Sequence, residues 1–158
     1  MKVLWTDGSA SPNPGPGGFA VLEVMDGEVK PVALGRDDDT TNIRMEGCAM
    51  VAAIEYAGAE GCEIHSDSEF WINVLTKWAN GWRKRDWHKS DAKKRVLEDG
   101  SIEWHGGEIA NLDLVVKLDE LYRKYPVRLV WVRGHVGTEY NELADEWANK
   151  AREGYKLG

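Results

Sequence analysis

Four acidic residues stand at positions from which a folded chain could bring them together. Asp7 and Asp67 each end a short β-prone segment, whereas Glu46 and Asp145 lie in segments of helical periodicity. Functional groups in open α/β sheets gather at the carboxyl ends of strands, so adjacent parallel strands would point Asp7 and Asp67 into one crevice. Taken singly, each acid has a plain structural interpretation, as a turn former, a helix-dipole partner or a solvated helix residue. Their joint arrangement is what favours a shared site.

Clustered carboxylates predict a bound metal ion. They repel one another unless a cation neutralises them, and ligands that are all oxygen favour a hard ion such as Mg²⁺ or Mn²⁺. Two such ions about 3.5 to 4 Å apart can activate a water molecule and stabilise a leaving oxygen. The chemistry that this arrangement indicates is hydrolysis of a phosphodiester.

The segments that would position the acids alternate between a two-residue and a 3.6-residue hydrophobic period, which predicts an α/β fold. Three strands without intervening helices come first and suggest antiparallel pairing, with a hairpin turn at 26–28. Thr41 or Asn42 can cap the first helix, and Ser66 with Glu69 has the spacing of a capping box for the second. The expected strands are 2–6, 18–24, 29–35, 62–67 and 127–132, and the expected helices are 42–59, 66–79, 111–125 and 139–152.

The composition fits one soluble domain. The chain of 158 residues can bury a core without disulfides, and 42% of its residues are hydrophobic. No run of 18 apolar residues offers a membrane span, and the first residues lack the apolar stretch of a secretory signal, so a cytoplasmic location is expected. Cys48 and Cys62 lie far apart without a nearby pair of histidines, which argues against a disulfide framework or a zinc site. We expect a single domain over 1–158, no membrane partner and, by default, a monomer.

The charge is unevenly distributed along the chain. The formal net charge of −7 argues at first against a polyanionic partner, because neutralising phosphates requires Lys and Arg. Residues 77–95, however, hold eight basic residues against two acids, a net charge of +6 that leaves −13 for the rest. Residues 97–108 then carry a DG turn and a GG pair, which indicate a surface excursion that can form a short hairpin.

Five motifs, in order along the chain, resemble the ribonucleases H of the bacterial type 1 group: TDGSASPNPGPGG, TTNIRMEGCA, HSDSEF, WANGWRKRDW and RGHVGTEYNELAD. They are spread over most of the chain and are together far more specific than a lone pair of carboxylates. The resemblance implies a ribonuclease H-like fold, in which a five-stranded mixed sheet is flanked by helices. It also implies an endonuclease that hydrolyses the RNA strand of an RNA/DNA hybrid and leaves a 3′-hydroxyl and a 5′-phosphate.

The resemblance assigns roles to individual residues. His135 would assist proton transfer or product release, which suits an imidazole that titrates near neutrality in a loop flanked by glycines. Asn141 would help to orient the site. Four acids would be catalytic and would hold two Mg²⁺ ions, with Mn²⁺ as the alternative metal. They are Asp7, Glu46, Asp67 and Asp145.

Two regions are implied to contact the hybrid. Selecting RNA requires sensing the 2′-hydroxyl, which lies in the wide minor groove of an A-like duplex. Thr41 matches a residue that grips a phosphate of the DNA strand, although a role as helix cap is as plausible. Residues 77–95 resemble the substrate-binding basic handle of the family, with Trp78 against DNA sugars and with Trp82 and Trp87 packed inside. The other candidate contacts are Gly8, Ser9, Ala10, Asn13 and Asn42 near the acids, and Arg83, Lys84 and Arg85 in the handle.

The chain also departs from the family pattern. Glu69 stands where many members carry a neutral Gln, and it adds a carboxylate beside Asp67 that would weaken a substrate contact or raise the metal requirement. Gly47 and Cys48 replace bulkier apolar residues, and a glycine inside a helix costs up to about 1 kcal/mol relative to alanine. The excursion at 97–108 is longer than usual, and the sequence assigns it no function.

Two other functions stay open at this stage. One is a nuclease of the same fold that acts on DNA, which the basic handle and the NPGPGG loop disfavour. The other is a non-catalytic module that binds hybrids. The four acids argue against it, because a pure binder of phosphates gains nothing from clustered negative charge.

Overall fold

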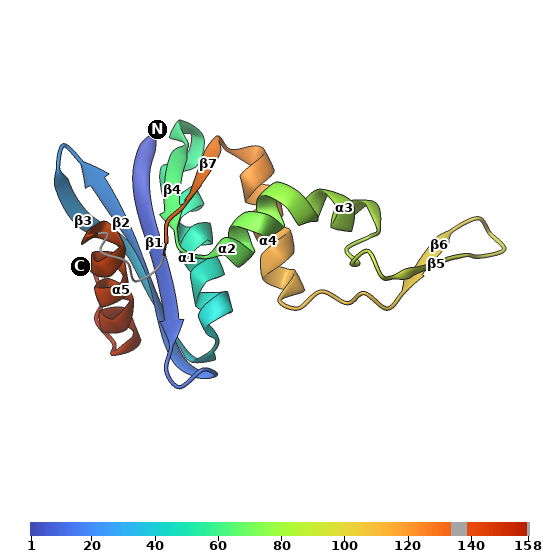
Figure 1. Ribbon diagram of the computed structural model, residues 1–158, viewed down its shortest axis with the longest axis horizontal. Coiled ribbons are helices and arrows are strands. Elements are labelled where there is room, and N and C mark those ends of the chain that lie inside the picture. The colour runs from blue at the N-terminus through green and yellow to red at the C-terminus, as the bar shows by residue number, and fades with distance from the viewer. Residues whose placement is uncertain (134–138, 158) are drawn as a thin grey trace.

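A five-stranded mixed sheet forms the centre of the computed structural model, which describes residues 1–133 and 139–157 (Figure 1). Its strands are β1 (Lys2–Ala10), β2 (Gly15–Met25), β3 (Glu28–Thr40), β4 (Cys62–Ser66) and β7 (Val127–Trp131). In space they run β3-β2-β1-β4-β7. The first three pair antiparallel, whereas β1 with β4 and β4 with β7 are parallel, so the predicted mixed sheet is confirmed.

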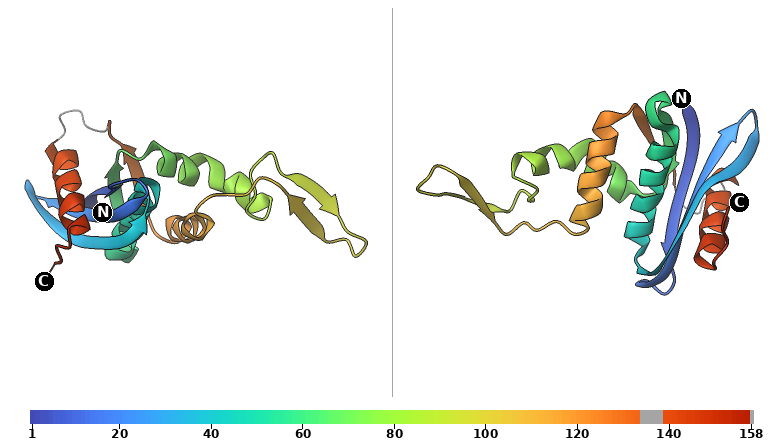
Figure 2. Two further views of the ribbon diagram at one scale, coloured as in Figure 1. Left: turned by 90° about the horizontal axis from the view of Figure 1, so that it is seen from below. Right: turned by 180° about the vertical axis from the view of Figure 1, so that it is seen from behind.

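Helices cover both faces of this sheet (Figure 2). α1 (Asn42–Ala57) and α4 (Leu112–Lys124) lie on one face, and α5 (Glu139–Arg152) lies on the other. A short 3₁₀ turn at Gly58–Glu60 follows α1. Leu4 and Trp5 are neighbours on β1 but belong to two different hydrophobic clusters, because side chains alternate between the faces of a strand. Across residues 1–133 and 139–157, no helix combines the length and apolar character needed to cross a membrane.

Strand β1 is longer than the hydrophobic alternation predicts. The alternation ends at residue 6, but β1 continues to Ala10, and residues 8–10 pair with 17–19 of β2. The low strand propensity of Gly and Ala explains why the expected strand stops before these residues, and the pairing with β2 overrides that local preference. Asp7 therefore lies inside a strand and not at its end. β3 likewise extends beyond the predicted 29–35, through three exposed aspartates to Thr40.

The predicted helix 66–79 is divided and starts later. It consists of α2 (Glu69–Asn73), a π-helical turn η2 (Val74–Trp78) and α3 (Ala79–Lys84). The predicted capping box at Ser66 is wrong, since Ser66 is buried at the end of β4 and its Oγ accepts a hydrogen bond from the Ser68 N–H at 3.0 Å. Ser68 is the N-cap instead, and its Oγ accepts from the Trp71 N–H at 3.3 Å.

The basic handle and the excursion form one continuous projection. Within it, β5 (Lys93–Val96) pairs antiparallel with β6 (Ile102–His105) as a separate two-stranded sheet, which we call the arm (93–105). The arm points away from the main sheet in each view (Figures 1 and 2). The predicted boundary between a handle ending at 95 and an excursion starting at 97 is wrong, because three handle cations form β5 and pair with residues of the excursion.

The space beside Gly47 in α1 is filled by Trp71. A Cβ atom at Gly47 would lie 2.7 Å from Cζ2 of Trp71 and 2.6 Å from Cδ2 of Leu114. The Trp71 ring is fully buried, and its Nε1 donates to the carbonyl of Ile43 at 2.7 Å. A glycine that costs helix stability thus makes room for the largest fully buried side chain among the described residues.

We expect Gly47→Ala to lower the free energy of unfolding by up to about 2 kcal/mol. Overpacking a well-packed core costs about 1 to 3 kcal/mol, and a gain of up to about 1 kcal/mol in helix propensity offsets part of this cost. Urea unfolding measures the difference. Gly81→Ala in α3 is the matched control, because its Cβ would meet only the flexible end of Arg85, 3.2 Å away. A stabilised Gly47→Ala protein would contradict the packing described.

Candidate active site

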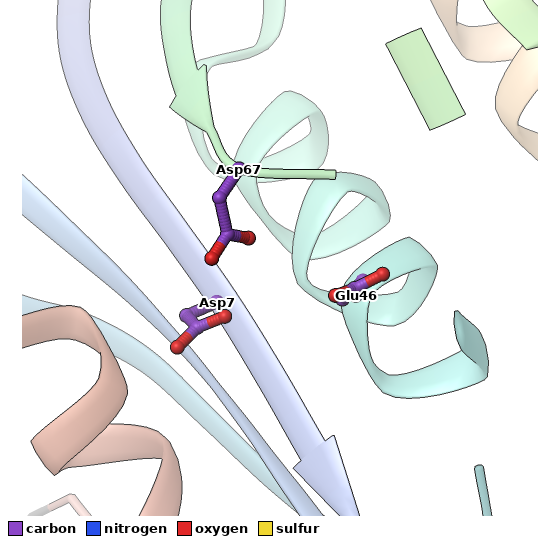
Figure 3. A group of neighbouring side chains, drawn as sticks. All are labelled: Asp7, Glu46 and Asp67. Carbon is purple, nitrogen blue, oxygen red and sulfur yellow. The ribbon is translucent and has the colours of Figure 1, made fainter. Parts of the chain in front are cut away.

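Three carboxylates meet beside the end of β4 (Figure 3). Asp7 comes from β1, Glu46 from α1, and Asp67 from the residue after β4. Each offers one oxygen, and these three oxygens lie within 4.8 Å of one another. The structure therefore brings together three of the four acids that the sequence singles out.

The sheet topology explains how Asp7 and Asp67 converge. β1 and β4 run parallel through the pair Trp5 and His65. Beyond this point β4 ends at Ser66 and the chain turns toward α2, whereas β1 continues along β2. Asp7 and Asp67 flank the place where the two strands diverge, which is where open α/β sheets bind ligands.

Glu46 joins the two aspartates because α1 approaches β1 closely at Gly8. A Cβ atom on Gly8 would lie 2.3 Å from the carbonyl carbon of Met45 and 2.5 Å from the Glu46 nitrogen. Any other residue would therefore push α1 away from the strand. The missing side chain at position 8 places Glu46 next to Asp7.

Asp145, the fourth predicted acid, reaches the cluster from the other face of the sheet. It lies in α5, and its carboxyl group hydrogen-bonds to Asp7. It is not one of the three acids whose oxygens share the 4.8 Å group. His135, for which a role in proton transfer or product release was predicted, lies outside the described residues.

The electrostatics of the cluster show an excess of negative charge. Burial, followed by the nearby charges of Asp67 and Asp145, raises the pKa of Asp7 to about 9. Burial and the charge of Asp67 raise the pKa of Glu46 to about 7, against a hydrogen bond from Ser68 that lowers it. A bound cation relieves this repulsion, and a donor set made only of carboxylate oxygens suits a hard ion. The residues present thus fit a Mg²⁺ or Mn²⁺ site.

Comparison with known proteins identifies the family of this chain. A sequence model of the family described as RNase H matches residues 1–153. The chain belongs to the RNase H family. Ribonuclease H of Granulibacter bethesdensis is 38% identical over 151 residues, which cover 94% of this chain and 90% of that protein. The family resemblance drawn from the five motifs is therefore confirmed.

Solved structures show the same fold. LC9-RNase H1, a type 1 RNase H with the type 2 active-site motif, superposes with a TM-score of 0.72 at 22% identity and covers 99% of this chain and 74% of that one. LC11-RNase H1, solved in complex with RNA/DNA hybrid, superposes with a TM-score of 0.61 at 20% identity, and the match covers 97% of each chain. The predicted ribonuclease H-like fold is thus confirmed.

In this RNase H family member, hydrogen bonds fix the segment that follows Asp7. The Ala10 N–H donates to Oδ1 of Asn42 at 2.7 Å, and the Asn42 N–H donates to Oδ1 of Asn13 at 3.2 Å. Oγ of Ser9 donates to Oδ1 of Asn149 on α5 at 3.3 Å. Both asparagine carbonyls near the acids are therefore engaged, so their amide NH₂ groups are the ends that can donate to a substrate oxygen.

The other predicted contacts near the acids have mixed surroundings. Thr41 is the N-cap of α1, and its Oγ1 accepts from the Arg44 N–H at 3.2 Å, so the alternative role as a helix cap is present. Its hydroxyl hydrogen can still be donated to a phosphate. Asn141 is buried in α5, whereas Glu69 is exposed as the first residue of α2.

The tryptophans of the basic handle divide by exposure. Trp78 is 39% exposed, whereas Trp82 is 8% exposed and Trp87 packs against the core, as the sequence predicts. The Trp78 ring lies 5.9 Å from that of Trp82 and 6.1 Å from that of Phe70, measured between centroids. These three rings line a hollow of about 350 Å³ together with Lys89, Ser90, Ile109 and Ala110.

This hollow is not predicted from the sequence, in which Lys89 is one of several cations, Phe70 ends a motif chosen for its acids, and Ser90 belongs to no motif. One signal in the sequence could have indicated the hollow, namely the spacing of eight residues from Phe70 to Trp78. Eight residues are slightly more than two helical turns, so both rings lie on one side of the helix. The hollow presents aromatic surfaces beside a cation.

The three basic residues predicted to bind substrate are not equivalent. Nε of Arg83 lies 3.0 Å from Oδ2 of the buried Asp119 on α4, which also pairs with Arg123 at 3.0 Å. Nε of Arg85 donates to the His88 carbonyl at 3.1 Å, whereas Lys84 is exposed. Arg83 therefore anchors the handle to α4.

Proposed function

We propose that this RNase H family member is an endonuclease that hydrolyses the RNA strand of RNA/DNA hybrids and leaves a 3′-hydroxyl and a 5′-phosphate. The observation that carries the proposal is the convergence of Asp7, Glu46 and Asp67 within 4.8 Å, next to asparagine donors that can meet a ribose. LC11-RNase H1, which shares the fold, has been solved with such a hybrid.

The four acids are the proposed ligands of two Mg²⁺ ions, with Mn²⁺ as the alternative. When bound, such ions activate a water molecule for attack on the phosphate and stabilise the departing 3′-oxygen. Asp7, Glu46 and Asp67 would hold them from one side, and Asp145 would approach from α5. His135 lies outside the described residues, and its proposed role in proton transfer or product release stays a prediction.

The residues around the acids would select and orient the hybrid. The NH₂ groups of Asn13 and Asn42 are directed by their engaged carbonyls and would donate to the 2′-hydroxyl, which DNA lacks. Gly8, Ser9 and Ala10 would present backbone to the RNA strand, and the Thr41 hydroxyl would donate to a DNA phosphate. Trp78 and the hollow beside it offer an apolar surface to deoxyribose sugars.

Metal binding is expected to release protons in a pH-dependent way. With pKa values of about 9 and about 7, Asp7 is mostly protonated and Glu46 half protonated at pH 7. A metal ion requires both to be ionised, so about one to two protons should leave on binding at pH 7, and fewer as the pH rises through 9. Titration calorimetry with Mg²⁺ in buffers of different ionisation enthalpy measures this number. Release that does not change between pH 6 and pH 9 would contradict the raised pKa values.

Neutralising Lys84 and Arg85 in the handle should weaken hybrid binding and flatten its dependence on salt. Each phosphate contact contributes about 0.9 to the slope of log K against log salt, so Lys84→Gln with Arg85→Gln should reduce that slope by about 1 to 2. Lys30→Gln, an exposed cation on β3, is the matched control and should leave it unchanged.

Arg83→Gln should differ from these variants, because it leaves the buried Asp119 with one partner fewer. We expect loss of stability in addition to weaker binding.

An unchanged salt slope in the variant that combines Lys84→Gln and Arg85→Gln would refute the proposed contact between the handle and the hybrid.

The function itself is tested with three end-labelled duplexes, namely RNA/DNA hybrid, double-stranded RNA and double-stranded DNA, each with Mg²⁺ or with EDTA. The proposal predicts cleavage of the hybrid alone, and only with the metal. Cleavage of double-stranded DNA alone would favour the DNA nuclease, and tight hybrid binding without cleavage in Mg²⁺ or Mn²⁺ would favour the binding module.

A further inference from the structure

Two successive side-chain contacts join α5 to β1 next to the acid cluster. Asp145 hydrogen-bonds to Asp7, and Oγ of Ser9 donates to Oδ1 of Asn149 at 3.3 Å. Residues two apart share a face of a strand, and residues four apart share a face of a helix, so the second contact continues the first. α5 therefore runs beside β1 from the acids toward Ser9 (Figure 3).

Arg152 continues this face of α5. It lies three residues after Asn149 and is partly buried, and its Nη2 donates to the same Oδ1 of Asn149 at 3.2 Å. Because Ser9 and Arg152 donate to one oxygen, a single acceptor separates the guanidinium from β1. Both donors occupy the Asn149 carbonyl, so the amide NH₂ group is the end of Asn149 that can donate to a ligand.

The charge of Arg152 differs from that of the neighbouring cations. Lys150, the other cation in the last turn of α5, pairs with Glu146 at 3.6 Å. Arg36 of β3, whose Nε donates to the Arg152 carbonyl at 2.8 Å, pairs with Asp38. In the described part of the chain, no acid forms an ion pair with Arg152, and its Nε is buried without an acceptor. A buried donor without an acceptor costs free energy, which a bound anion relieves.

We propose that Arg152 and Asn149 form a subsite that binds a phosphate of the RNA strand. Arg152 supplies the charge and the planar donors that suit phosphate oxygens, and the Asn149 amide adds a neutral donor. Ser9, which is expected to meet the RNA strand, hydrogen-bonds to Asn149, and this contact favours the RNA strand over the DNA strand. The inference rests on the proposed function and adds a contact that holds the strand at a distance from the acids.

The position of the subsite predicts which phosphate it binds. Arg152 follows Asp145 by seven residues, which span about 10.5 Å of helix axis. One strand of a duplex presents a phosphate about every 3.4 Å along its axis, so the bound phosphate is expected within about three nucleotides of the cleaved one. A contact there contributes affinity and takes no part in breaking the bond. Arg152 is therefore a binding residue and not a catalytic one.

Stabilisation of α5 is the competing explanation for Arg152. A cation in the last turn of a helix complements the helix dipole, and both Lys150 and Arg152 lie in that turn. Lys150, however, is held by Glu146 and lies 4.3 Å from the centre of the Trp147 ring, whereas Arg152 is joined through Asn149 to the strand that carries Asp7. A purely structural role predicts that Arg152→Gln lowers the stability and leaves hybrid binding unchanged.

Binding of RNA/DNA hybrid in EDTA, where no cleavage is expected, tests the subsite. Arg152→Gln should bind the hybrid about tenfold more weakly, and the slope of log K against log salt should fall by about 0.9, which corresponds to one phosphate contact. Lys150→Gln is the matched control, because it removes a cation from the same turn and should leave the slope unchanged. Wild-type affinity and slope in Arg152→Gln, or an equal loss in Lys150→Gln, would overturn the proposal.

Hybrids that carry one uncharged methylphosphonate at a time identify the bound phosphate. Wild type should lose about tenfold in affinity at one RNA position within about three nucleotides of the site cut in Mg²⁺, and Arg152→Gln should lose nothing further there. A protein that binds the hybrid without cutting it in Mg²⁺ would defeat the proposed function, while this binding pattern would still test Arg152. Further losses in Arg152→Gln equal to those of wild type at every RNA position, or a protected position only on the DNA strand, would refute the subsite.

Discussion

Replacing Asp7 by Asn is expected to abolish RNA-strand cleavage and, at the same time, to stabilise the metal-free protein. Losing a metal ligand at the reacting phosphate should cost about 4 kcal/mol or more of transition-state stabilisation, which is about a thousandfold in rate. Asparagine keeps the size of the side chain, so the fold is retained. The rate of hybrid cleavage in saturating Mg²⁺ measures the loss.

The gain in stability has a defined sign and pH window. Burial and neighbouring carboxylates raise the pKa of Asp7 from 3.8 to about 9, so the folded state binds the proton more tightly than the unfolded chain does. In wild type the carboxyl therefore destabilises the fold increasingly as the pH rises from about 4 to about 9. Asn removes this penalty, and we expect a gain of about 1 to 3 kcal/mol at pH 7 and little at pH 4.

Urea unfolding in EDTA at pH 4, 7 and 9 measures this gain. Glu146→Gln is the matched control on α5, where a surface pair with Lys150 at 3.6 Å contributes little. An Asp7→Asn protein that is no more stable than wild type at pH 7 would show that the carboxylates do not repel one another as the geometry requires.

The second large effect is expected from Gly8→Ala, which adds one methyl group. Its Cβ would lie 2.3 Å from backbone of Met45, where no side-chain rotation can relieve the clash. The strand and α1 must separate, so we expect a loss of about 3 kcal/mol of stability, the upper end for overpacking. Glu46 moves away from Asp7 with the helix, and the Mg²⁺ concentration for half-maximal cleavage should rise by about tenfold.

Unfolding and Mg²⁺ titration of cleavage check both parts of this prediction. Gly81→Ala again serves as the control, because the same substitution there meets only a flexible arginine. Wild-type metal dependence in Gly8→Ala would mean that the contact between β1 and α1 does not position Glu46.

The sequence predicted the acid cluster well, because strand ends and helix periodicity are local signals. Asp67 follows β4 as expected, and Glu46 lies on α1 as expected. Asp7 reaches the same place for a reason that the sequence does not reveal, since β1 continues past it and β4 is the strand that ends. The contact at Gly8, which joins strand and helix, is visible only once both are packed.

The parts that the sequence did not predict depend on tertiary contacts. Ser66 has the spacing of a cap but is buried in the sheet, so Ser68 caps α2 instead. Gly47 lowers the helix propensity of α1, but its missing side chain leaves the space that Trp71 fills, which the sequence does not reveal. Arg83 belongs to a basic run, yet its partner Asp119 is 36 residues away in the sequence, too far for a local pattern to reveal.

The central claim is that the cluster of Asp7, Glu46 and Asp67 cuts RNA opposite DNA. The most direct measurement uses one hybrid, labelled separately on its RNA and DNA strands, with wild-type protein and with Asp67→Asn in Mg²⁺. We expect that only the RNA strand is shortened, that its fragments end in a 3′-hydroxyl, and that Asp67→Asn leaves both strands intact. Cleavage of the DNA strand, or RNA cleavage by Asp67→Asn at the wild-type rate, would contradict it.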